Sequence, residues 1–375
     1  MAEVPAATTA VFKIDLARVL SNWHVLNRQV RPAFAAAVIK ANAYGMGADE
    51  VGSVLARAGC RLFFVARLDE AVRLRQVLKP LNLTPQPMIA VLDGYVAGHA
   101  GDYQGHGLMP VISSIEQLRE WVSENDPSLH HRAILHFDTG MNRIGLSLTD
   151  SAEVCLYSQS MLDPWWGLIS HLANDEDPTD PWVILQKQRF DSLLPQIPHQ
   201  RASLAASSGI GLGHGYHYDF VRPGLGLYGL YPIALEGKTL PLQPALSVYG
   251  RVMQCRTVDA GAAVGYGATE VMEDGGRVAV IGLGYADFFP RSLDLNQPLT
   301  VKLAGYQVRP IGRVSMDLMT LDISQVPPDR VKAGDWAEVV GDDNSVMAIA
   351  TAASTSPYEV LTRLGSRAYR HRVQP

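Results

Sequence analysis

Short apolar segments alternate with helical patterns from about residue 34 to residue 228. This alternation is typical of parallel strands whose connecting helices cover the sheet. Eight of the apolar segments have the length of a strand, namely Phe34–Lys40, Leu62–Ala66, Met88–Leu92, Leu108–Ile112, Arg132–Phe137, Gly167–His171, Arg201–Ala206 and Phe220–Arg222. Eight such units predict an α/β fold built on a (β/α)8 TIM-type barrel. A doubly wound sheet with two extra strands is the alternative that the pattern leaves open.

The pattern changes after the proline-bracketed segment Pro241–Leu246. Apolar and polar residues then alternate with a period of two, and turns that contain glycine separate the segments, which predicts antiparallel strands. We therefore expect a barrel over 11–241 and a mostly β C-terminal domain over 242–375. A short helix, Pro357–Leu364, should end the second domain. The N-terminal strand, within 8–15, could belong to either domain.

The composition is that of a folded globular protein. Of the 375 residues, 47% are hydrophobic and 18% are charged, which excludes a disordered or fibrous chain. The formal net charge of −5 gives no electrostatic reason to expect a nucleic-acid partner. The apolar runs are far shorter than the roughly 20 residues that span a bilayer. The N-terminal segment also lacks the basic and apolar regions of a signal peptide, so we expect a cytoplasmic protein without a membrane partner.

The cysteines and histidines predict neither a disulfide nor a metal site. Cys60, Cys155 and Cys255 are widely spaced and form no CxxC pair, which fits reduced thiols. The eleven histidines show no HExxH or Cys/His ligand spacing, so we expect no metal.

Lys40 is the first candidate for chemistry. It follows a wholly apolar segment at the carboxyl end of the first expected barrel strand, where barrel enzymes place their catalytic groups. Partial burial among alanines lowers the pKa of an amine and favours Schiff-base chemistry. A strand-end lysine that merely reaches solvent is the alternative, and the spacing alone does not decide between the two.

The sequence around Lys40, AVIKANAYGMGADEV, resembles the cofactor-lysine signature of the alanine racemases. Further segments that resemble this family extend over nearly the whole chain in the family's order. They are DTGMNRIG, ISHLA, VRPGLGLYG, VGYGAT, GYADFFPR, GRVSMD and SPYEVLTRLGSR. The resemblance implies a barrel-type pyridoxal-phosphate (PLP) enzyme, an isomerase that interconverts L-alanine and D-alanine and supplies D-alanine as a peptidoglycan precursor.

The resemblance also implies the roles of individual residues. Lys40 would hold PLP covalently and act as the base on the D-alanine face. Tyr266 would be the second base, specific for L-alanine and contributed by the opposite subunit of a homodimer with shared active sites. His171 and Arg222 would form the supporting network. Arg222 would face the pyridine nitrogen and, because a guanidinium only donates, would leave that nitrogen unprotonated.

The family's phosphate site would be formed by three hydroxyls and two backbone groups of this chain. The hydroxyls are those of Tyr44, Ser207 and Tyr358, and the N–H groups lie near Gly224 and Leu225. Barrels commonly bind phosphate after their seventh and eighth strands, which is where Ser207, Gly224 and Leu225 fall.

Arg143 and the backbone of Met316 match the family's positions for binding the substrate carboxylate, a role that suits a planar guanidinium. The chain departs from the family at three places. Met46 stands where histidine is more common, and Ala206 stands where asparagine usually precedes the phosphate serine. His136 stands where many members have a carbamylated lysine that positions the arginine. We hypothesise that the imidazole of His136 or a bound anion takes over this task.

Three other functions remain alternatives. The first is racemisation of another amino acid, such as serine or lysine, or broad specificity. The second is a PLP decarboxylase, against which Arg222 argues because those enzymes generally place an acid at the pyridine nitrogen. The third is a non-catalytic PLP-carrying barrel, which would lack the β domain that supplies Tyr266.

Overall fold

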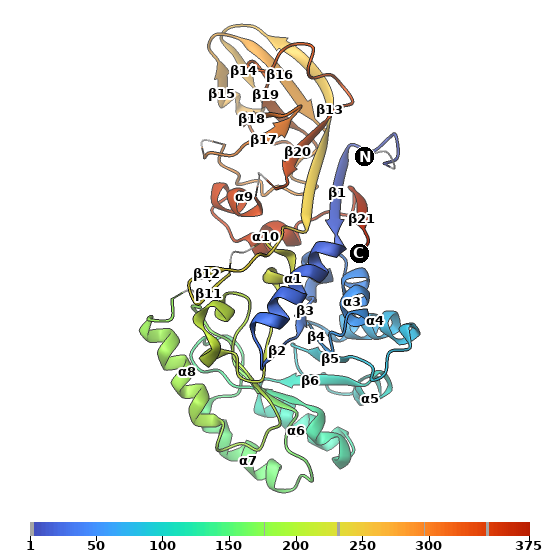
Figure 1. The fold of residues 1–375 in the computed structure, drawn as a ribbon, viewed down its shortest axis with the longest axis vertical. Helices are drawn as coiled ribbons and strands as arrows, with labels where there is room; N and C mark the ends of the chain where they lie inside the picture. The colour runs from blue at the N-terminus through green and yellow to red at the C-terminus, as the bar shows by residue number, and fades with distance from the viewer. Residues whose placement is uncertain (1–3, 176, 231–232, 296, 343–344) are drawn as a thin grey trace. The chain divides into compact units, whose positions relative to one another are not determined.

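The computed structural model describes residues 4–175, 177–230, 233–295, 297–342 and 345–375 (Figure 1). The chain divides into two compact units. The first, here called the barrel unit, comprises Val19–Ala43 and Gly47–Leu242. The second, the β unit, comprises Met1–Arg18, Tyr44–Met46 and Gln243–Pro375.

The barrel unit contains a ring of parallel strands, as predicted. Its strands are β2 (Phe34–Ala35), β3 (Ala37–Val38), β4 (Leu62–Val65), β5 (Met88–Val91), β6 (Leu108–Ile112), β7 (Ile134–His136), β8 (Gly167–Ile169), β9 (Ala202–Ser203) and β10 (Phe220–Val221). Strands β3 to β9 pair in chain order, and β10 pairs in parallel with β2. The N–H of Asp219 donates to the Ala202 carbonyl at 3.0 Å, and the N–H of Arg222 donates to the Ala205 carbonyl at 2.9 Å. These bonds join the segment of β10 to that of β9. All eight expected segments therefore contain strands, and the doubly wound alternative is wrong.

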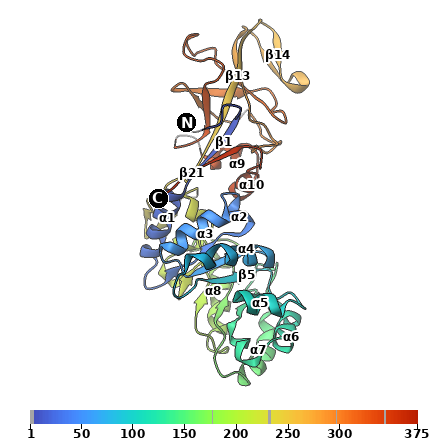
Figure 2. The same cartoon turned by 90° about the vertical axis from the view of Figure 1, so that its right-hand side faces the viewer.

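Helices connect these strands, and in Figure 2 α4, α5, α6 and α7 lie outside the parallel strands. The α-helices up to the end of the barrel unit are α1 (Leu16–Gln29), α2 (Lys40–Tyr44), α3 (Ala48–Arg57), α4 (Leu68–Leu78), α5 (Ala100–His106), α6 (Ile115–Glu124), α7 (Ser151–Gln159) and α8 (Pro181–Leu193). The short 3-10 helices are η1 (Lys79–Leu81), η2 (Pro127–Arg132), η3 (Leu148–Asp150), η4 (Ser208–Leu212), η5 (His214–Tyr216) and η6 (Leu225–Tyr228). A small hairpin follows, formed by β11 (Ala234–Leu235) and β12 (Lys238–Thr239). No helix among the described residues is long and apolar enough to cross a membrane.

Phe220 lies in the strand pair that closes the ring. Its ring stacks on Phe34 with centroids 5.5 Å apart and on Phe64 with centroids 6.2 Å apart, and it contacts Trp166 at 5.7 Å. Phe220 is fully buried. Because a buried aromatic ring contributes both its apolar area and its packing, this cluster stabilises the closure of the barrel.

We predict that Phe220→Ala lowers the free energy of unfolding by about 3–5 kcal/mol, because it leaves a cavity among three aromatic neighbours. Phe220→Leu should cost less. The measurement is urea-induced unfolding followed by circular dichroism. Leu162→Ala is the control, since Leu162 is 99% exposed and its truncation should change stability by less than about 0.5 kcal/mol. Equal unfolding midpoints for the two alanine variants would contradict the role of Phe220.

The β unit contains antiparallel strands, as the period-two alternation predicted, and they form a second closed sheet, which the alternation did not predict. Its elements are β1 (Ala10–Asp15), β13 (Leu246–Val258), β14 (Ala262–Val264), η7 (Tyr266–Ala268), β15 (Glu270–Met272), β16 (Gly276–Ile281), β17 (Val301–Leu303), β18 (Tyr306–Ile311), β19 (Met319–Asp322), β20 (Trp336–Val340), α9 (Val346–Ala352), α10 (Pro357–Thr362) and β21 (Tyr369–Val373). The sheet order is β16-β19-β18-β17-β20-β13, and the additional pairing of β13 with β16 closes the ring. Strand β1 pairs antiparallel with β13, so the N-terminal strand lies in the β unit.

The end of the chain differs from the expectation. Helix α10 begins after Ser356, whose hydroxyl accepts from the Glu359 N–H, but it ends at Thr362 rather than Leu364. The chain then continues into β21, which pairs in parallel with β1. Strand β21 reads YRHRV, and its charged residues hid it from a search for apolar alternation.

Candidate active site

The segment α2, which follows β3, is a left-handed turn rather than a regular α-helix, and its positive φ values begin directly after Lys40. Ala41, Asn42, Ala43 and Tyr44 have φ values of 51°, 54°, 54° and 55°. The left-handed conformation costs an L-residue roughly 1–2 kcal/mol, and none of these four residues is glycine. The surrounding structure must therefore hold the turn in place, as often happens at functional sites.

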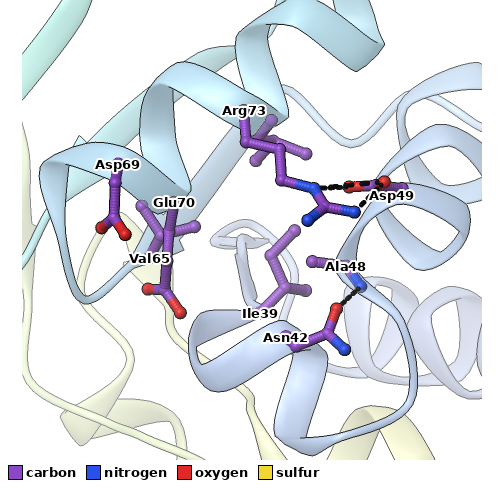
Figure 3. Close-up of a pocket in the computed structure, with 9 residues that line it drawn as sticks. Ile39, Asn42, Ala48, Asp49, Val65, Asp69, Glu70 and Arg73 are labelled. Carbon is purple, nitrogen blue, oxygen red and sulfur yellow. Dashed lines mark hydrogen bonds and ion pairs between the residues drawn. The ribbon is translucent and has the colours of Figure 1, made fainter. Parts of the chain in front are cut away.

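Specific hydrogen bonds hold both ends of this turn. The N–H of Ala41 donates to Oε1 of Glu70 at 2.7 Å. At the other end, the side-chain oxygen of Asn42 accepts from the Ala48 N–H at 2.9 Å, and its carbonyl accepts from the Gly47 N–H at 2.9 Å. Figure 3 shows Asn42 and Glu70 lining the same pocket beside this turn. The position of Lys40 is thus set by a turn anchored on two sides.

Five basic side chains gather at the carboxyl ends of the barrel strands. Lys40 follows β3, His136 ends β7, His171 follows β8, Arg222 follows β10, and Arg143 lies in the loop after β7. Arg143 and Arg222 lower the pKa of both histidines, Arg143 also lowers that of Lys40, and the charge of Lys40 acts on His171. Because parallel strands end at one rim, the sequence's separate candidates form one cationic cluster.

The Lys40 amine has a pKa below its ordinary value. Burial is the main cause, and the positive charge of Arg143 adds to it, whereas Glu70 and Asp93 oppose the shift. Among the described residues the amine has no hydrogen-bond or ion-pair partner. An amine with a lowered pKa and no partner is a suitable nucleophile and base.

His136 and His171 are neutral at pH 7 for the same reason. Burial, aided by Arg222, lowers the pKa of His136 to about 4 and that of His171 to about 3. His136 is only 9% exposed. The two rings therefore add no positive charge to a rim that already carries two arginines.

Arg222 is held by backbone oxygens of neighbouring strands. Its two Nη atoms donate to the carbonyls of Ser203, Ser170 and Leu204 at 2.8, 2.5 and 3.2 Å, and to the Ser203 hydroxyl at 2.7 Å. It is 5% exposed, and burial lowers its pKa. Within the part of the chain that the structure describes, Nε has no hydrogen-bond partner. Arg222 therefore retains one donor for a ligand.

The expected phosphate residues fall into two groups. In the barrel unit, the Ser207 hydroxyl accepts from the N–H groups of Gly224 and Gly226 at 2.9 and 3.0 Å, beside Leu225 at the start of η6. In the β unit, the rings of Tyr44 and Tyr358 lie 5.9 Å apart between centroids. Tyr44 is buried, and Tyr358 is 42% exposed.

Tyr266 and Met316 lie in the β unit and are accessible. Tyr266 begins η7 and is 72% exposed, and Met316 is 52% exposed. The Met316 carbonyl accepts from the Ala286 N–H at 3.0 Å, whereas its own N–H has no partner among the described residues. A Cβ at Gly284 would come within 2.2 Å of that carbonyl, so only glycine permits this approach.

Asp287 and Arg367 fix the loops around Met316. The buried Asp287 carboxylate accepts from the Gly284 N–H at 3.0 Å and from Nε of Arg367 at 2.9 Å. Arg367 also donates to Asp317, the residue after Met316, at 2.8 Å. The Met316 N–H, which has no partner among the described residues, is thereby held in a defined place.

Sequence reasoning missed the polar residues that support the rim. Gln186 donates to the hydroxyl of Thr139 at 3.3 Å and to the carbonyl of His171 at 3.1 Å, and Thr139 shares a 2.8 Å hydrogen bond with Ser170. All three side chains are buried. Glu70 was also missed, because an acid in the first turn of a helix is common at any helix start. The only signal in the sequence that could have indicated these supporting residues is that they are polar residues among mostly apolar neighbours.

We predict that the stability of the folded protein falls at acid pH because His136 resists protonation when it is buried. Its folded pKa of about 4 lies below the ordinary 6.5, so the unfolded chain takes up a proton first as the pH falls. Stability is therefore complete above pH 6.5 and is lost progressively towards pH 4, by about 2 kcal/mol at pH 5. Thermal unfolding at pH 7 and pH 5 measures this loss.

His136→Gln should remove that part of the acid sensitivity, and His24→Gln, which removes an exposed imidazole, should retain it. An unchanged pH dependence in His136→Gln would show that His136 is not the group responsible.

Fold and site together define a two-unit barrel enzyme with a lysine at the centre of a cationic rim. Comparison with known proteins assigns it more closely. Residues 14–232 match the alanine racemase N-terminal domain, and residues 245–372 match the alanine racemase C-terminal domain. The chain therefore belongs to the alanine racemase family.

Individual relatives agree with this assignment. An alanine racemase of Rhodospirillum rubrum is 38% identical over 369 residues, which cover 96% of this chain and 94% of the relative. The crystal structure of alanine racemase from Bartonella henselae, with covalently bound pyridoxal phosphate, is 33% identical, with a TM-score of 0.87 and coverage of 97% and 99%. The biosynthetic enzyme of Pseudomonas aeruginosa is 30% identical, with a TM-score of 0.87 and coverage of 98% and 100%.

Proposed function

We propose that this protein interconverts L-alanine and D-alanine with PLP bound to Lys40. The observation that carries the proposal is the partly buried Lys40 amine, with its lowered pKa, at the rim of a barrel whose chain belongs to the alanine racemase family. The covalently bound PLP of the Bartonella henselae structure supports the cofactor assignment.

The residues of the rim fit an anionic, ring-shaped cofactor. Lys40, Arg143 and Arg222 carry positive charge there, and the Arg222 Nε–H is available to an acceptor such as a pyridine nitrogen. Because a guanidinium cannot supply a proton, Arg222 would leave that nitrogen unprotonated. Ser207, backbone N–H groups near Gly224 and Leu225, and the hydroxyls of Tyr44 and Tyr358 would hold the phosphate, with the Gly224 N–H exchanging its bond to Ser207 for one to the phosphate. His171 would support Arg222.

Racemisation by the two-base mechanism that we propose places a proton acceptor on each face of the substrate Cα. PLP, when bound, withdraws electrons from Cα and so acidifies its proton. The Lys40 amine would remove or return the proton on the D-alanine face, a task that its lowered pKa favours. Tyr266 would serve the L-alanine face. Its 72% exposure supports presentation of its phenol to a second copy of the chain, and we propose a homodimer with shared sites.

Arg143 and the Met316 N–H would bind the substrate carboxylate. Both groups lack a partner among the described residues, which leaves them available to an anion. His136 would act as a neutral imidazole beside Arg143, where many family members carry a carbamylated lysine.

We further propose that the protein acts in the cytoplasm and supplies D-alanine for peptidoglycan. The biosynthetic alanine racemases of Mesorhizobium japonicum and Pseudomonas aeruginosa support this role.

We predict that Lys40→Ala loses more than about 10⁴-fold in racemisation, because it removes both the covalent attachment of PLP and one base. A coupled assay for D-alanine formed from L-alanine measures this, alongside the visible absorbance of the bound cofactor. Lys238→Ala, at an exposed lysine of β12, is the control and should stay active. Racemisation of serine or lysine but not alanine would overturn the substrate assignment.

We predict that Tyr266→Phe loses about 10²–10⁴-fold in racemisation, since a phenyl ring cannot accept a proton. Solvent isotope should then enter the α-position from D-alanine but hardly from L-alanine. Proton NMR in heavy water measures both rates, and Tyr306→Phe, a tyrosine of the same unit, is the control. Equal losses for both enantiomers would contradict a one-face role.

A further inference from the structure

Glu70 makes two kinds of contact from the first turn of α4. Its Oε2 accepts from the N–H groups of Ala66 and Arg67 at 2.8 and 3.3 Å, which caps the helix and joins it to the end of β4. Its Oε1 accepts from the Ala41 N–H at 2.7 Å. The first contact is ordinary helix capping, but the second reaches 29 residues back along the chain to the residue next to Lys40.

The Ala41 N–H lies at the start of the left-handed turn, directly after Lys40. Ala41 is the first of four consecutive residues with positive φ, and it directly follows Lys40, so the course of this turn bears on where the Lys40 side chain is placed. Asn42 anchors the far end of the turn through Ala48. The contact with Glu70 anchors the near end, and a hydrogen bond to a charged acceptor is stronger than one to a neutral acceptor.

Glu70 also acts on the Lys40 amine through its charge. The charged groups that affect this amine are Arg143, in the loop after β7, Glu70 on α4, and Asp93 after β5. The Lys40 charge in turn affects the neutral ring of His171. Glu70 and Asp93 favour the protonated amine against burial and Arg143, so loss of either carboxylate should make Lys40 less basic.

We propose that Glu70 is a positioning residue for Lys40, whose carboxylate fastens the left-handed turn to β4 and α4 and directs the amine into the cationic rim. This proposal rests on the proposed function in which Lys40 binds PLP. It assigns to Glu70 no contact with substrate or cofactor.

The neighbouring acids provide a matched control. Asp69 is the adjacent residue of α4 and lines the same pocket, and in Figure 3 its carboxylate lies on the far side of Glu70 from Asn42. Asp49 is bound to Arg73 at 2.8 Å and is less suitable. Asp69→Asn therefore removes one negative charge from the same helix start without touching the turn.

Two substitutions at Glu70 separate the effect of its side-chain length from the effect of its charge. Glu70→Asp keeps the charge and can still cap α4, but it is one methylene too short to hold Ala41 as well. Glu70→Gln keeps the length but loses the charge, and its NH2 group cannot accept a hydrogen bond on one side of the bridge.

The first experiment uses the cofactor-free protein. Hydrogen exchange at the Ala41 amide should accelerate at least about tenfold in Glu70→Asp, because the amide loses its acceptor. The pH midpoint for chemical labelling of the Lys40 amine, followed by peptide mass spectrometry, should fall by about half a unit or more in Glu70→Gln. Asp69→Asn should match the wild type in both measurements.

The second experiment adds PLP to the cofactor-free protein. The dissociation constant, measured by visible absorbance and by borohydride trapping on the Lys40 peptide, should rise about tenfold in Glu70→Asp. Wild-type exchange at Ala41 and wild-type PLP affinity in Glu70→Asp would overturn the positioning role. So would a labelling midpoint in Glu70→Gln equal to that in Asp69→Asn.

These outcomes are distinct from those that test the proposed function. If the wild type took up no PLP at Lys40, the proposed function would fail, whereas the exchange and labelling measurements need no cofactor and would still decide the role of Glu70.

Discussion

Closure of the parallel ring is the constraint on which the site depends. Strand β10 pairs in parallel with β2, and this pairing brings the last strand of the ring beside the first with their carboxyl ends on the same side. Arg222 and Lys40, separated by more than 180 residues, thereby reach the same rim. The stacked rings of Phe220, Phe34 and Phe64 supply the apolar packing at this junction. Without closure the chain would hold the same residue types but no common site.

The rim also illustrates how burial selects protonation states. Three groups that carry or can carry positive charge surround two imidazoles, and burial keeps both rings neutral at pH 7. The same burial lowers the pKa of the Lys40 amine, while Glu70 and Asp93 limit the shift. The result is an amine that loses its proton at a lower pH than an ordinary lysine, beside guanidinium groups that only donate.

The sequence predicted the barrel because buried parallel strands produce continuous apolar runs, and all eight segments contained strands even where the strand itself is short, as in β9. It predicted the β unit through period-two alternation. The turn over Ala41 to Tyr44 could not be predicted, because Ala and Tyr rarely adopt positive φ and the single Asn42, which does so more readily, does not indicate a run of four such residues. Strand β21 was hidden by its charged residues, and Glu70 by a position where an acid is expected anyway. The site was accessible chiefly through family resemblance, since spacing alone left Lys40 undecided.

The loop that carries Arg143 presents an unusual balance of charge. The acid nearest along the chain, Asp138, uses its carboxylate to accept from the N–H groups of Gly140 and Met141 at 2.7 and 2.8 Å. The Asp138 carboxylate thus shapes the loop rather than pairing with Arg143. Within the described residues Arg143 has no ion-pair partner. His136 is neutral, so it supplies no negative charge where a carbamylated lysine would. A substrate carboxylate would then be the first anion to meet Arg143, and the guanidinium would need to exchange no internal partner to bind it. This favours a binding role for Arg143 that depends on the substrate rather than on a preformed ion pair.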